Sequence, residues 1–251
     1  FVLRYFMDLS YDGTNYHGWQ NQPNAISVQS CIEKALSILT KSDTHIYGAG
    51  RTDAGVHAIK MFAHFDSHKL INITKLMHDL NSFLAKDISV NNIYRVNNDS
   101  HARFDAISRE YEYNISLSKD VFNINKSYYV YHNLDVKLMN DACTILKNHV
   151  NFKCFSRSKT DVKTYNCDLT LAKWELSNDQ LIFTIKANRF LRNMVRAIVG
   201  TMIQVGNKKI NLKNFEEILI SQDRTKAGPS APAHALYLSN IEYPKEIFAN
   251  E

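Results

Sequence analysis

The segment GAGRTDAGVHA, at residues 48–58, holds the side chains of this sequence that are best suited to catalysis. It places Arg51, Asp53 and His57 among three of the chain's eight glycines. Glycine lets a second backbone or a planar ligand approach closely. An arginine two residues away can hold a carboxylate ionised, or can bind a phosphate. Because an ionised carboxylate in a tight loop suits nucleophilic or base chemistry, Asp53 is the candidate catalytic residue.

A glycine-rich segment of this kind also occurs in several different classes of protein. The dinucleotide-binding pattern G-x-G-x-x-G requires glycine at position 53, and no G-K-[ST] of a P-loop follows. An acid–base hydrolase such as a nuclease would use Asp53 with His57, whereas a purely structural loop would use Asp53 to cap its own turn. The histidines do not converge in a helical pattern, and no cysteine pair has the C-x-x-C spacing of a zinc site. The sequence thus predicts neither a metal nor an organic cofactor.

A basic segment in the second half of the chain indicates a phosphate-rich partner. Residues 186–213 contain seven basic side chains and no acidic one. Such a run attracts phosphates, unless it is simply a solvated helix face. Arg189, Arg192 and Arg196 would form one stripe on a long helix that is predicted from about Phe190. A separate apolar stripe on that helix consists of Leu191, Met194, Val195, Ile198, Val199, Met202 and Ile203.

Alternating and helical patterns predict a chain that mixes helices and strands around these residues. In residues 1–106 the order is β-α-β-β-α-β, with helices at about 28–39 and 73–84 and strands at 2–11, 45–50, 60–66 and 88–96. Residues 107–251 roughly repeat it. The predicted fold class is α+β, with two ferredoxin-like (RRM-like) halves whose antiparallel sheets flank a central active-site cleft. The first half carries Asp53, and the second carries the basic segment.

Composition narrows the class of protein further. The chain has 251 residues, 45% of them hydrophobic, and a net charge of +5, so it can bury a core without disulfides or metals. No apolar run approaches the roughly 18 residues that span a bilayer. The stretch FVLRYFMDLS contains Arg4 and Asp8, and is therefore predicted to be a strand rather than a signal peptide. Because scattered free cysteines are typical of a reducing compartment, we expect a cytoplasmic protein that binds no membrane.

Five motifs together resemble those of the tRNA pseudouridine synthase A family. GRTDAGVHA resembles the family's active-site motif, in which the aspartate is catalytic. The other four follow in the family's order: YDGTNYHGWQNQPNAISVQ at 11–29, SREYEY at 108–113, FLRNMVRAIVGTM at 190–202 and AGPSAPAHALYL at 227–238. The matches span nearly the whole chain. Glu110 departs from the pattern, since a basic or neutral residue is more usual beside Tyr111.

The resemblance implies an isomerase that converts uridine to pseudouridine in the anticodon stem-loop of tRNA, at tRNA positions 38, 39 and 40. The N1–C1′ glycosidic bond breaks, and the base rotates and rejoins through C5, with no cofactor. Asp53 would attack C1′ or C6, or would remove a proton from C2′, and all three routes remain open. The family works as a homodimer. A net charge of +5 suits two chains that share one phosphate backbone.

The resemblance also assigns roles to residues outside the Asp53 loop. Arg196 would pair with Asp53 and keep it ionised. Tyr111 would stack on the target base and take part in proton transfer. The other expected substrate contacts are Arg51, Arg189, Arg192 and Leu236.

Two further expectations concern the surface and an alternative function. Tyr16, His17 and Trp19 are expected at the dimer or RNA surface. The alternative to an enzyme is a non-catalytic RNA-binding module, because two α+β halves with basic patches would also serve that purpose. Such a module gives no reason for Asp53 to lie in a glycine-rich loop beside Arg51.

Overall fold

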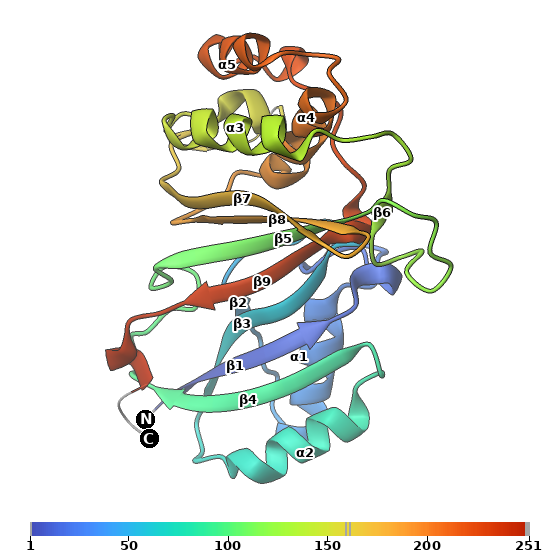
Figure 1. Cartoon of the computed structure of the whole chain (residues 1–251). Coiled ribbons are helices and arrows are strands. Elements are labelled where there is room, and N and C mark those ends of the chain that lie inside the picture. Colours follow the sequence, from blue (N-terminus) through green and yellow to red (C-terminus); the bar gives the residue numbers. More distant parts are fainter. Residues whose placement is uncertain (1, 159, 161, 249–251) are drawn as a thin grey trace. The chain divides into compact units, whose positions relative to one another are not determined.

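The protein folds into two compact units, seen in a computed structural model that describes residues 2–158, 160 and 162–248 (Figure 1). Unit 1 comprises Phe1–Ile107 together with Tyr237–Glu251, and unit 2 comprises Ser108–Leu236. The last segment, which the sequence groups with the second half, therefore belongs to unit 1. Each unit combines helices with a sheet, so the predicted mixture of α and β structure is confirmed.

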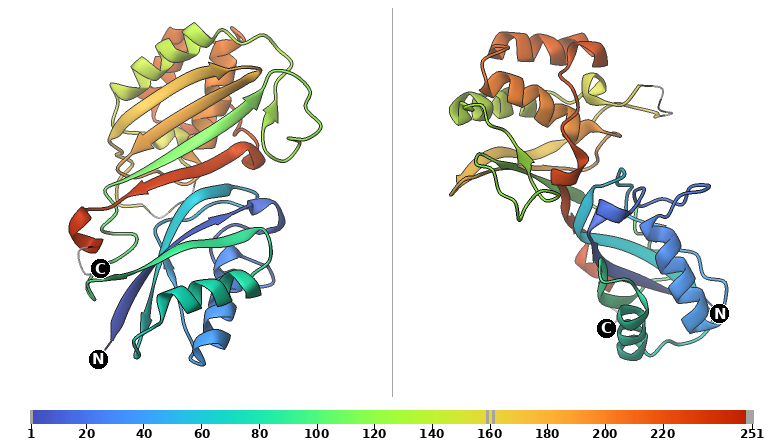
Figure 2. Two further views of the ribbon diagram at one scale, coloured as in Figure 1. Left: turned by 60° about the horizontal axis from the view of Figure 1, so that its bottom comes forward. Right: turned by 90° about the vertical axis from the view of Figure 1, so that its right-hand side faces the viewer.

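Unit 1 is built on a sheet whose central strands are largely buried. β1 (Leu3–Tyr11) lies between β3 (His57–Ser67) and β4 (Ile88–Val96) and is antiparallel to both. Helices α1 (Val28–Thr40) and α2 (Ile73–Phe83) pack against each other on one face of this sheet (Figure 2). β2 (Tyr47–Gly48) also pairs with β3. It is shorter than the predicted strand at 45–50. The N–H of Ala49 still donates to the carbonyl of Phe62 on β3, and the chain then leaves the sheet to form the Asp53 loop.

Side-chain caps determine where the helices of unit 1 begin. The Ser27 hydroxyl accepts a hydrogen bond from the backbone N–H of Ser30 at 3.0 Å, and the Ser30 hydroxyl oxygen accepts one from the backbone N–H of Ser27. This is a capping box, and it starts α1 where the sequence predicts. Asn72 caps α2 by accepting from the N–H of Lys75. The buried side chains of α1 and α2 are Val28, Ile32, Ala35, Leu36, Leu76 and Leu80.

The last strand completes unit 1. β9 (Leu236–Glu242) runs parallel to β3, with Tyr237 opposite His57 and Leu238 opposite Ala58. After β9, Tyr243 enters an aromatic cluster whose other rings come from β1, β3, β4 and the carboxyl-terminal turn: Phe6, Phe62, Tyr94 and Phe248. Aromatic pairs of this kind contribute about 0.5 to 1.5 kcal/mol each beyond their buried area. The segment that follows β9 therefore stabilises unit 1.

Unit 2 places three helices on one side of a sheet that is antiparallel except for the short β6 (Figure 1). β8 (Gln180–Ala187) lies between β5 (Ser108–Ser116) and β7 (Leu169–Ser177), and β6 (Tyr128–Tyr129) pairs with β5. The helices are α3 (Val136–Lys147), α4 (Met194–Gly206) and α5 (Leu212–Ser221). α3 packs against β7, and α5 packs against α3 and α4. The core of this unit includes Met139, Leu146, Trp174, Phe183, Ile198, Met202 and Phe215. Among the described residues, no helix is long and apolar enough to cross a bilayer.

The long helix begins four residues later than predicted. Asn193 has a left-handed backbone with φ of 67°, and α4 starts after it at Met194. A left-handed residue cannot continue a right-handed helix, so Arg189 and Arg192 precede α4 and only Arg196 lies on it. The predicted stripe of three arginines on one helix face is therefore wrong. The predicted apolar positions of α4 are buried, apart from Ile203, which is half-buried.

The basic segment 186–213 does not form one continuous surface. Lys208 and Lys209 follow the end of α4, and a helix of 13 residues separates its two ends by about 20 Å. Lys208 Nζ also lies 3.5 Å from a carboxylate oxygen of Asp135. The arginines before and within α4 are thus a separate group from the lysines that follow it.

His64, on β3, is a buried histidine that the fold keeps neutral. Its Nδ1 accepts a hydrogen bond from the backbone N–H of Ala102 at 3.1 Å, and its ring stacks on Phe6. Burial, followed by the nearby charge of Arg4, lowers the pKa of His64 to about 4. The ordinary value is about 6.5. The unfolded chain therefore binds more protons than the folded chain as the pH falls from 6.5 to 4, and stability falls with it.

We predict that His64 alone lowers the free energy of unfolding by roughly 2 to 3 kcal/mol between pH 7 and pH 4. The variant His64→Asn keeps an acceptor near the Nδ1 position but does not titrate. It should be less stable than wild type at pH 7 and should show a correspondingly flatter dependence on pH. Urea unfolding at a series of pH values measures both effects. Identical pH dependence in the two proteins would remove His64 as the cause.

Candidate active site

Asp53 lies in a tight loop of unit 1, between β2 and β3. Its backbone carbonyl accepts a hydrogen bond from the N–H of Val56 at 3.1 Å, which closes a turn through Ala54 and Gly55. Gly55 has φ of 80°, a conformation that favours glycine. Asp53 is half-buried, whereas Arg51 is exposed. The loop thus presents a carboxylate from a backbone whose path is fixed by its own turn.

A second segment, residues 11–19, holds the Asp53 loop in place. The N–H of Trp19 donates to the carbonyl of Thr52 at 3.2 Å, and the N–H of Gly55 donates to the carbonyl of Tyr16 at 3.4 Å. The hydroxyls of Tyr11 and Thr52 lie 2.8 Å apart in a buried hydrogen bond. The residues on both sides of Asp53 are therefore tied to the segment that follows β1.

Three glycines allow these two stretches to approach so closely. A Cβ on Gly13 would lie 1.9 Å from the carbonyl oxygen of Val56, and one on Gly18 would lie 2.4 Å from that of Thr52. A Cβ on Gly48 would meet the indole of Trp19 at 2.4 Å. Real Cβ atoms essentially never come within 3.0 Å of such neighbours. Gly13, Gly18 and Gly48 are thus required by the contact between the two stretches.

The expected surface role of Tyr16 and Trp19 is wrong. Their exposed fractions are 7% and 2%, because Trp19 packs beneath Gly48 and the Tyr16 hydroxyl donates to Asp87 at 2.5 Å. His17 between them is exposed. In the sequence, large rings among polar residues resemble a surface motif. In the structure, Tyr16 and Trp19 form the buried support on which the Asp53 loop rests.

His57 belongs to the same buried support of the Asp53 loop. Its side chain is 2% exposed, and its ring packs 4.8 Å from that of Tyr237 on β9. Its Nδ1 accepts a hydrogen bond from the backbone N–H of Gly13 at 3.0 Å, and lies 3.0 Å from a carboxylate oxygen of Asp12. A histidine buried among these partners suits a structural role better than that of the base in a hydrolase. Among the described residues, no group of three His, Cys, Asp or Glu side chains could hold a metal ion.

In unit 2, Tyr111 lies on β5 opposite Ile185 of β8. Its ring meets that of Phe190 edge to face, with centroids 5.1 Å apart and planes at 89°. Tyr111 is half-buried. The Phe190 contact holds the ring in a perpendicular aromatic pair.

Arg196, on the first turn of α4, is locked to the segment AGPSAPA by a reciprocal pair of bonds. Its Nε donates to the carbonyl of Ala231 at 2.8 Å, and its own carbonyl accepts from the N–H of Ala231 at 2.9 Å. One turn later, a Cβ on Gly200 would lie 1.7 Å from the carbonyl oxygen of Pro229. The guanidinium is thus held by a close backbone approach that only glycine permits.

Sequence reasoning missed the residues that hold this segment from the other side. The Ser230 hydroxyl accepts from Asn193 Nδ2 at 2.6 Å and from Arg224 Nη2 at 3.0 Å, while Arg224 Nη1 donates to the carbonyl of Gly228. Asn193 is also the left-handed residue that starts α4. The one local sign of this arrangement in the sequence was the asparagine at position 193, because asparagine tolerates the left-handed conformation.

The remaining predicted contacts lie near, but not within, these two arrangements. Arg189 Nη1 donates to the carbonyl of Thr164 at 3.2 Å. Arg192 is exposed, and its carbonyl accepts from the N–H of Arg157. Leu236, the first residue of β9, is 5% exposed and belongs to the core.

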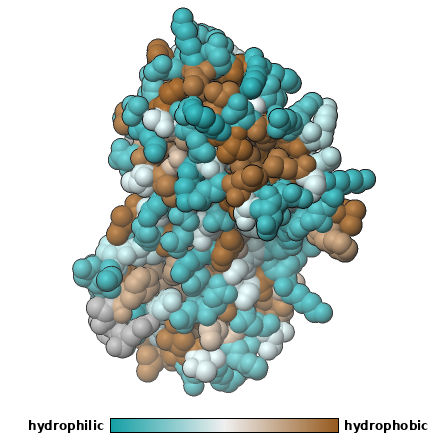
Figure 3. Space-filling view, in the orientation of Figure 1, coloured by the Kyte–Doolittle hydropathy of each residue, from teal (hydrophilic) through white to brown (hydrophobic). Residues whose placement is uncertain are grey.

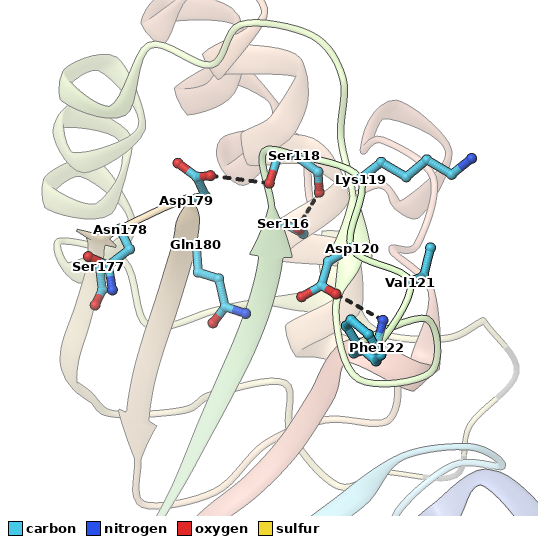
Figure 4. A pocket seen from close by; sticks show the side chains of 10 residues that line it. All are labelled: Ser116, Ser118, Lys119, Asp120, Val121, Phe122, Ser177, Asn178, Asp179 and Gln180. Carbon is cyan, nitrogen blue, oxygen red and sulfur yellow. Dashed lines mark hydrogen bonds between the residues drawn. The ribbon is translucent and has the colours of Figure 1, made fainter.

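A pocket of about 470 Å³ lies elsewhere on unit 2, where β5 ends beside the turn between β7 and β8 (Figure 4). Its walls are mainly polar, and Ser118 and Asp179 bond across one side. None of the predicted site residues lines it. The loop that borders it carries exposed apolar side chains (Figure 3), namely Val121, Phe122 and Ile124.

Comparison with known proteins identifies the family. A family model described as tRNA pseudouridine synthase matches residues 9–105 and 147–244. The chain belongs to the tRNA pseudouridine synthase family. Proteins named tRNA pseudouridine synthase A from Bacteroides thetaiotaomicron and Bacteroides fragilis are 49% and 50% identical to it over 253 and 249 residues. These alignments cover 100% and 98% of this chain, and 94% and 99% of the relatives.

Membership of the tRNA pseudouridine synthase family makes the chain an enzyme of the isomerase class, as its motifs predict. A more distant relative of the same name, from Aliivibrio salmonicida, is 36% identical over 97% of this chain and 94% of its own length. The matched residues of the family model include Asp53 and Arg196, whereas Tyr111 falls in the gap between the two matched segments.

We predict that Gly18→Ala destabilises the protein by about 3 kcal/mol, because a left-handed residue and a clash add their costs. Gly18 has φ of 84° and touches Thr52, the neighbour of Asp53, so isomerase activity should fall as well. Gly50→Ala is the matched control, because a Cβ there meets nothing within 4 Å. Thermal unfolding and turnover are measured on both. Similar losses in the two variants would contradict a specific role for the Gly18 contact.

Proposed function

We propose that this enzyme isomerises uridine to pseudouridine in the anticodon stem-loop of tRNA, at positions 38, 39 and 40, with Asp53 as the catalytic nucleophile or base. The observation that carries the proposal is the loop of Asp53. It lies inside the span matched by the family, and hydrogen bonds and glycine contacts fix its backbone on both sides of Asp53. Proteins named for this activity align with nearly the full chain.

The chemistry breaks one bond to C1′ and makes another. The N1–C1′ bond of uridine is cleaved, the base turns, C5 bonds to C1′, and the C5 proton is lost while N1 gains one. Asp53 starts this sequence by attack on C1′ or C6, or by removal of a proton from C2′. A fixed carboxylate lowers the entropic cost of each of these steps.

Arg196 and Tyr111 complete the proposed catalytic group. Arg196 would supply the positive charge that keeps Asp53 ionised during turnover, and its bond to Ala231 holds the guanidinium in one orientation. Tyr111 would offer its ring face to the uracil after the base has left its own stack. The perpendicular contact with Phe190 supports this role, because it orients the Tyr111 ring.

The substrate would be held by contacts on either side of this group. Exposed Arg51 and Arg192 would bind phosphates of the displaced strand, and Arg189 would add a third contact from the segment before α4. Leu236 would pack near the uracil from the start of β9.

We also propose how the two halves of the chain, and two chains, are arranged. Two ferredoxin-like halves would face each other across a central active-site cleft, and two chains would form a homodimer that shares one tRNA in the cytoplasm. A net charge of +5 per chain supports shared binding, since two chains double the positive charge offered to one backbone.

We predict that Asp53→Asn abolishes turnover and leaves tRNA affinity within a few-fold of wild type. The amide keeps the shape of the side chain but cannot act as a nucleophile or base, whereas affinity comes mainly from cationic contacts to phosphates. Release of tritium from C5-tritiated uridine in tRNA measures turnover, and filter binding measures affinity. Turnover near the wild-type rate would exclude Asp53 from the reaction. Strand cleavage by wild type, seen on a gel, would instead indicate a nuclease.

For Arg196 we predict that the charge matters more than the hydrogen bond to Ala231. Arg196→Gln keeps a donor but no charge, and should lower the single-turnover rate by about 100-fold or more. Arg196→Lys restores the charge without the forked geometry, and should recover part of that loss. Rates are compared at saturating tRNA, with unfolding temperature as the control for packing. If Arg196→Gln is as fast as Arg196→Lys in a single turnover, Arg196 serves only to hold the segment AGPSAPA.

A further inference from the structure

Unit 1 carries a group of exposed rings and one guanidinium that the proposed catalytic group does not use. We call it the aromatic platform, and it consists of Tyr47 on β2 with His101, Arg103 and Phe104 in the loop between β4 and β5. Phe104 is 73% exposed and Tyr47 is 56% exposed. Exposed apolar side chains that lie singly are normal, whereas a contiguous group of them can mark a binding surface.

The rings of the platform follow one another in close contact. Tyr47 stacks on buried His64, with centroids 5.1 Å apart and planes at 19°. His101 meets His64 at 4.5 Å and Phe104 at 4.3 Å. The guanidinium carbon of Arg103 lies 5.7 Å from the centre of the Phe104 ring, within range of a cation–π contact.

Several hydrogen bonds hold the loop that presents Phe104. The N–H of Ala102 donates to His64 Nδ1 at 3.1 Å, the N–H of His101 donates to Asp105 Oδ2 at 2.6 Å, and the N–H of Arg103 donates to His101 Nδ1 at 3.1 Å. The Tyr243 hydroxyl donates to the carbonyl of Ala102. A side chain on a loop fixed by so many bonds gives up little entropy when a ligand stacks on it.

The two histidines in and beneath the platform are neutral near pH 7. Burial is the main cause that lowers the pKa of both His64 and His101, and the charge of Arg4 adds to it. The platform therefore offers uncharged ring faces, with Arg103 as its positive group. Arg4, beside it, forms a bidentate pair with Asp66.

We propose that the aromatic platform binds an unpaired base of the tRNA substrate, with the Phe104 ring stacked on the base and Arg103 on its phosphate. This combination of ring face and guanidinium is how proteins hold single-stranded nucleic acid. The inference rests on the proposed function, and it concerns a contact away from the reacting uridine. Tyr47 is opposite His64 on β3, seven residues along that strand from His57, or about 23 Å. An RNA bound at the Asp53 loop can extend that far along unit 1.

The affinity of a full-length tRNA transcript tests the platform. Phe104→Ala should weaken binding about 5- to 150-fold, the effect of losing one stacked base. Phe104→Trp should bind within a few-fold of wild type, because it restores a ring face, whereas Phe104→Leu should behave like Phe104→Ala. Phe83→Ala is the control, since Phe83 is also exposed, at 47%, and ends α2 in the same unit.

Each outcome decides the proposal. It is overturned if Phe104→Ala binds tRNA as Phe83→Ala does, if leucine restores binding as well as tryptophan, or if the wild-type chain binds no tRNA. It is also overturned if Phe104→Ala changes the sedimenting mass of the chain without changing tRNA affinity, because the patch then joins two proteins. Tritium release is measured on the same samples. Wild-type protein that binds tRNA through Phe104 but releases no tritium would refute the isomerase and leave the platform intact.

Discussion

The rest of this structure depends on how closely two stretches of backbone approach each other in unit 1. The segment 11–19 meets the Asp53 loop at distances where a Cβ on Gly13 would lie 1.9 Å from a carbonyl oxygen. Hydrogen bonds to Thr52 and Gly55 then fix the chain on both sides of Asp53. A catalytic group positioned by backbone contacts does not have to be ordered when the substrate arrives, which is the main physical advantage of a rigid site.

Unit 2 solves a similar problem by the same means. Gly200 lets the carbonyl of Pro229 approach α4, and the paired bonds between Arg196 and Ala231 hold the two segments together. In both units a motif far away in the sequence supplies the supporting backbone. A glycine in one motif therefore marks the place where the backbone of the other motif approaches. The sequence of one motif alone does not show which distant segment approaches it.

What the sequence could predict depended on how local the signal was. The strand at 88–96 and the helix at 73–84 have their pattern within themselves, and the structure places β4 and α2 there within a residue. The start of α4 was mispredicted because Asn193 takes its conformation with Ser230, which is 37 residues away. The burial of Trp19 was missed for a similar reason, since it depends on Gly48. Asp53 could be put forward as a candidate because its glycines and arginine lie in one short segment, whereas the supports of Arg196 are spread over three.

The return of the last strand to unit 1 has a consequence for synthesis on the ribosome. β9 pairs with β3 beside the Asp53 loop, and Tyr243 fills the aromatic cluster on β1 and β3. These residues emerge only after all of unit 2 has been translated. Until then the edge of β3 at His57 and Ala58 lacks its neighbour, and exposed strand edges invite pairing with other chains. The nascent protein must therefore keep this edge from aggregating while unit 2 is made, and the base of the Asp53 loop is among the last parts of the enzyme to be completed.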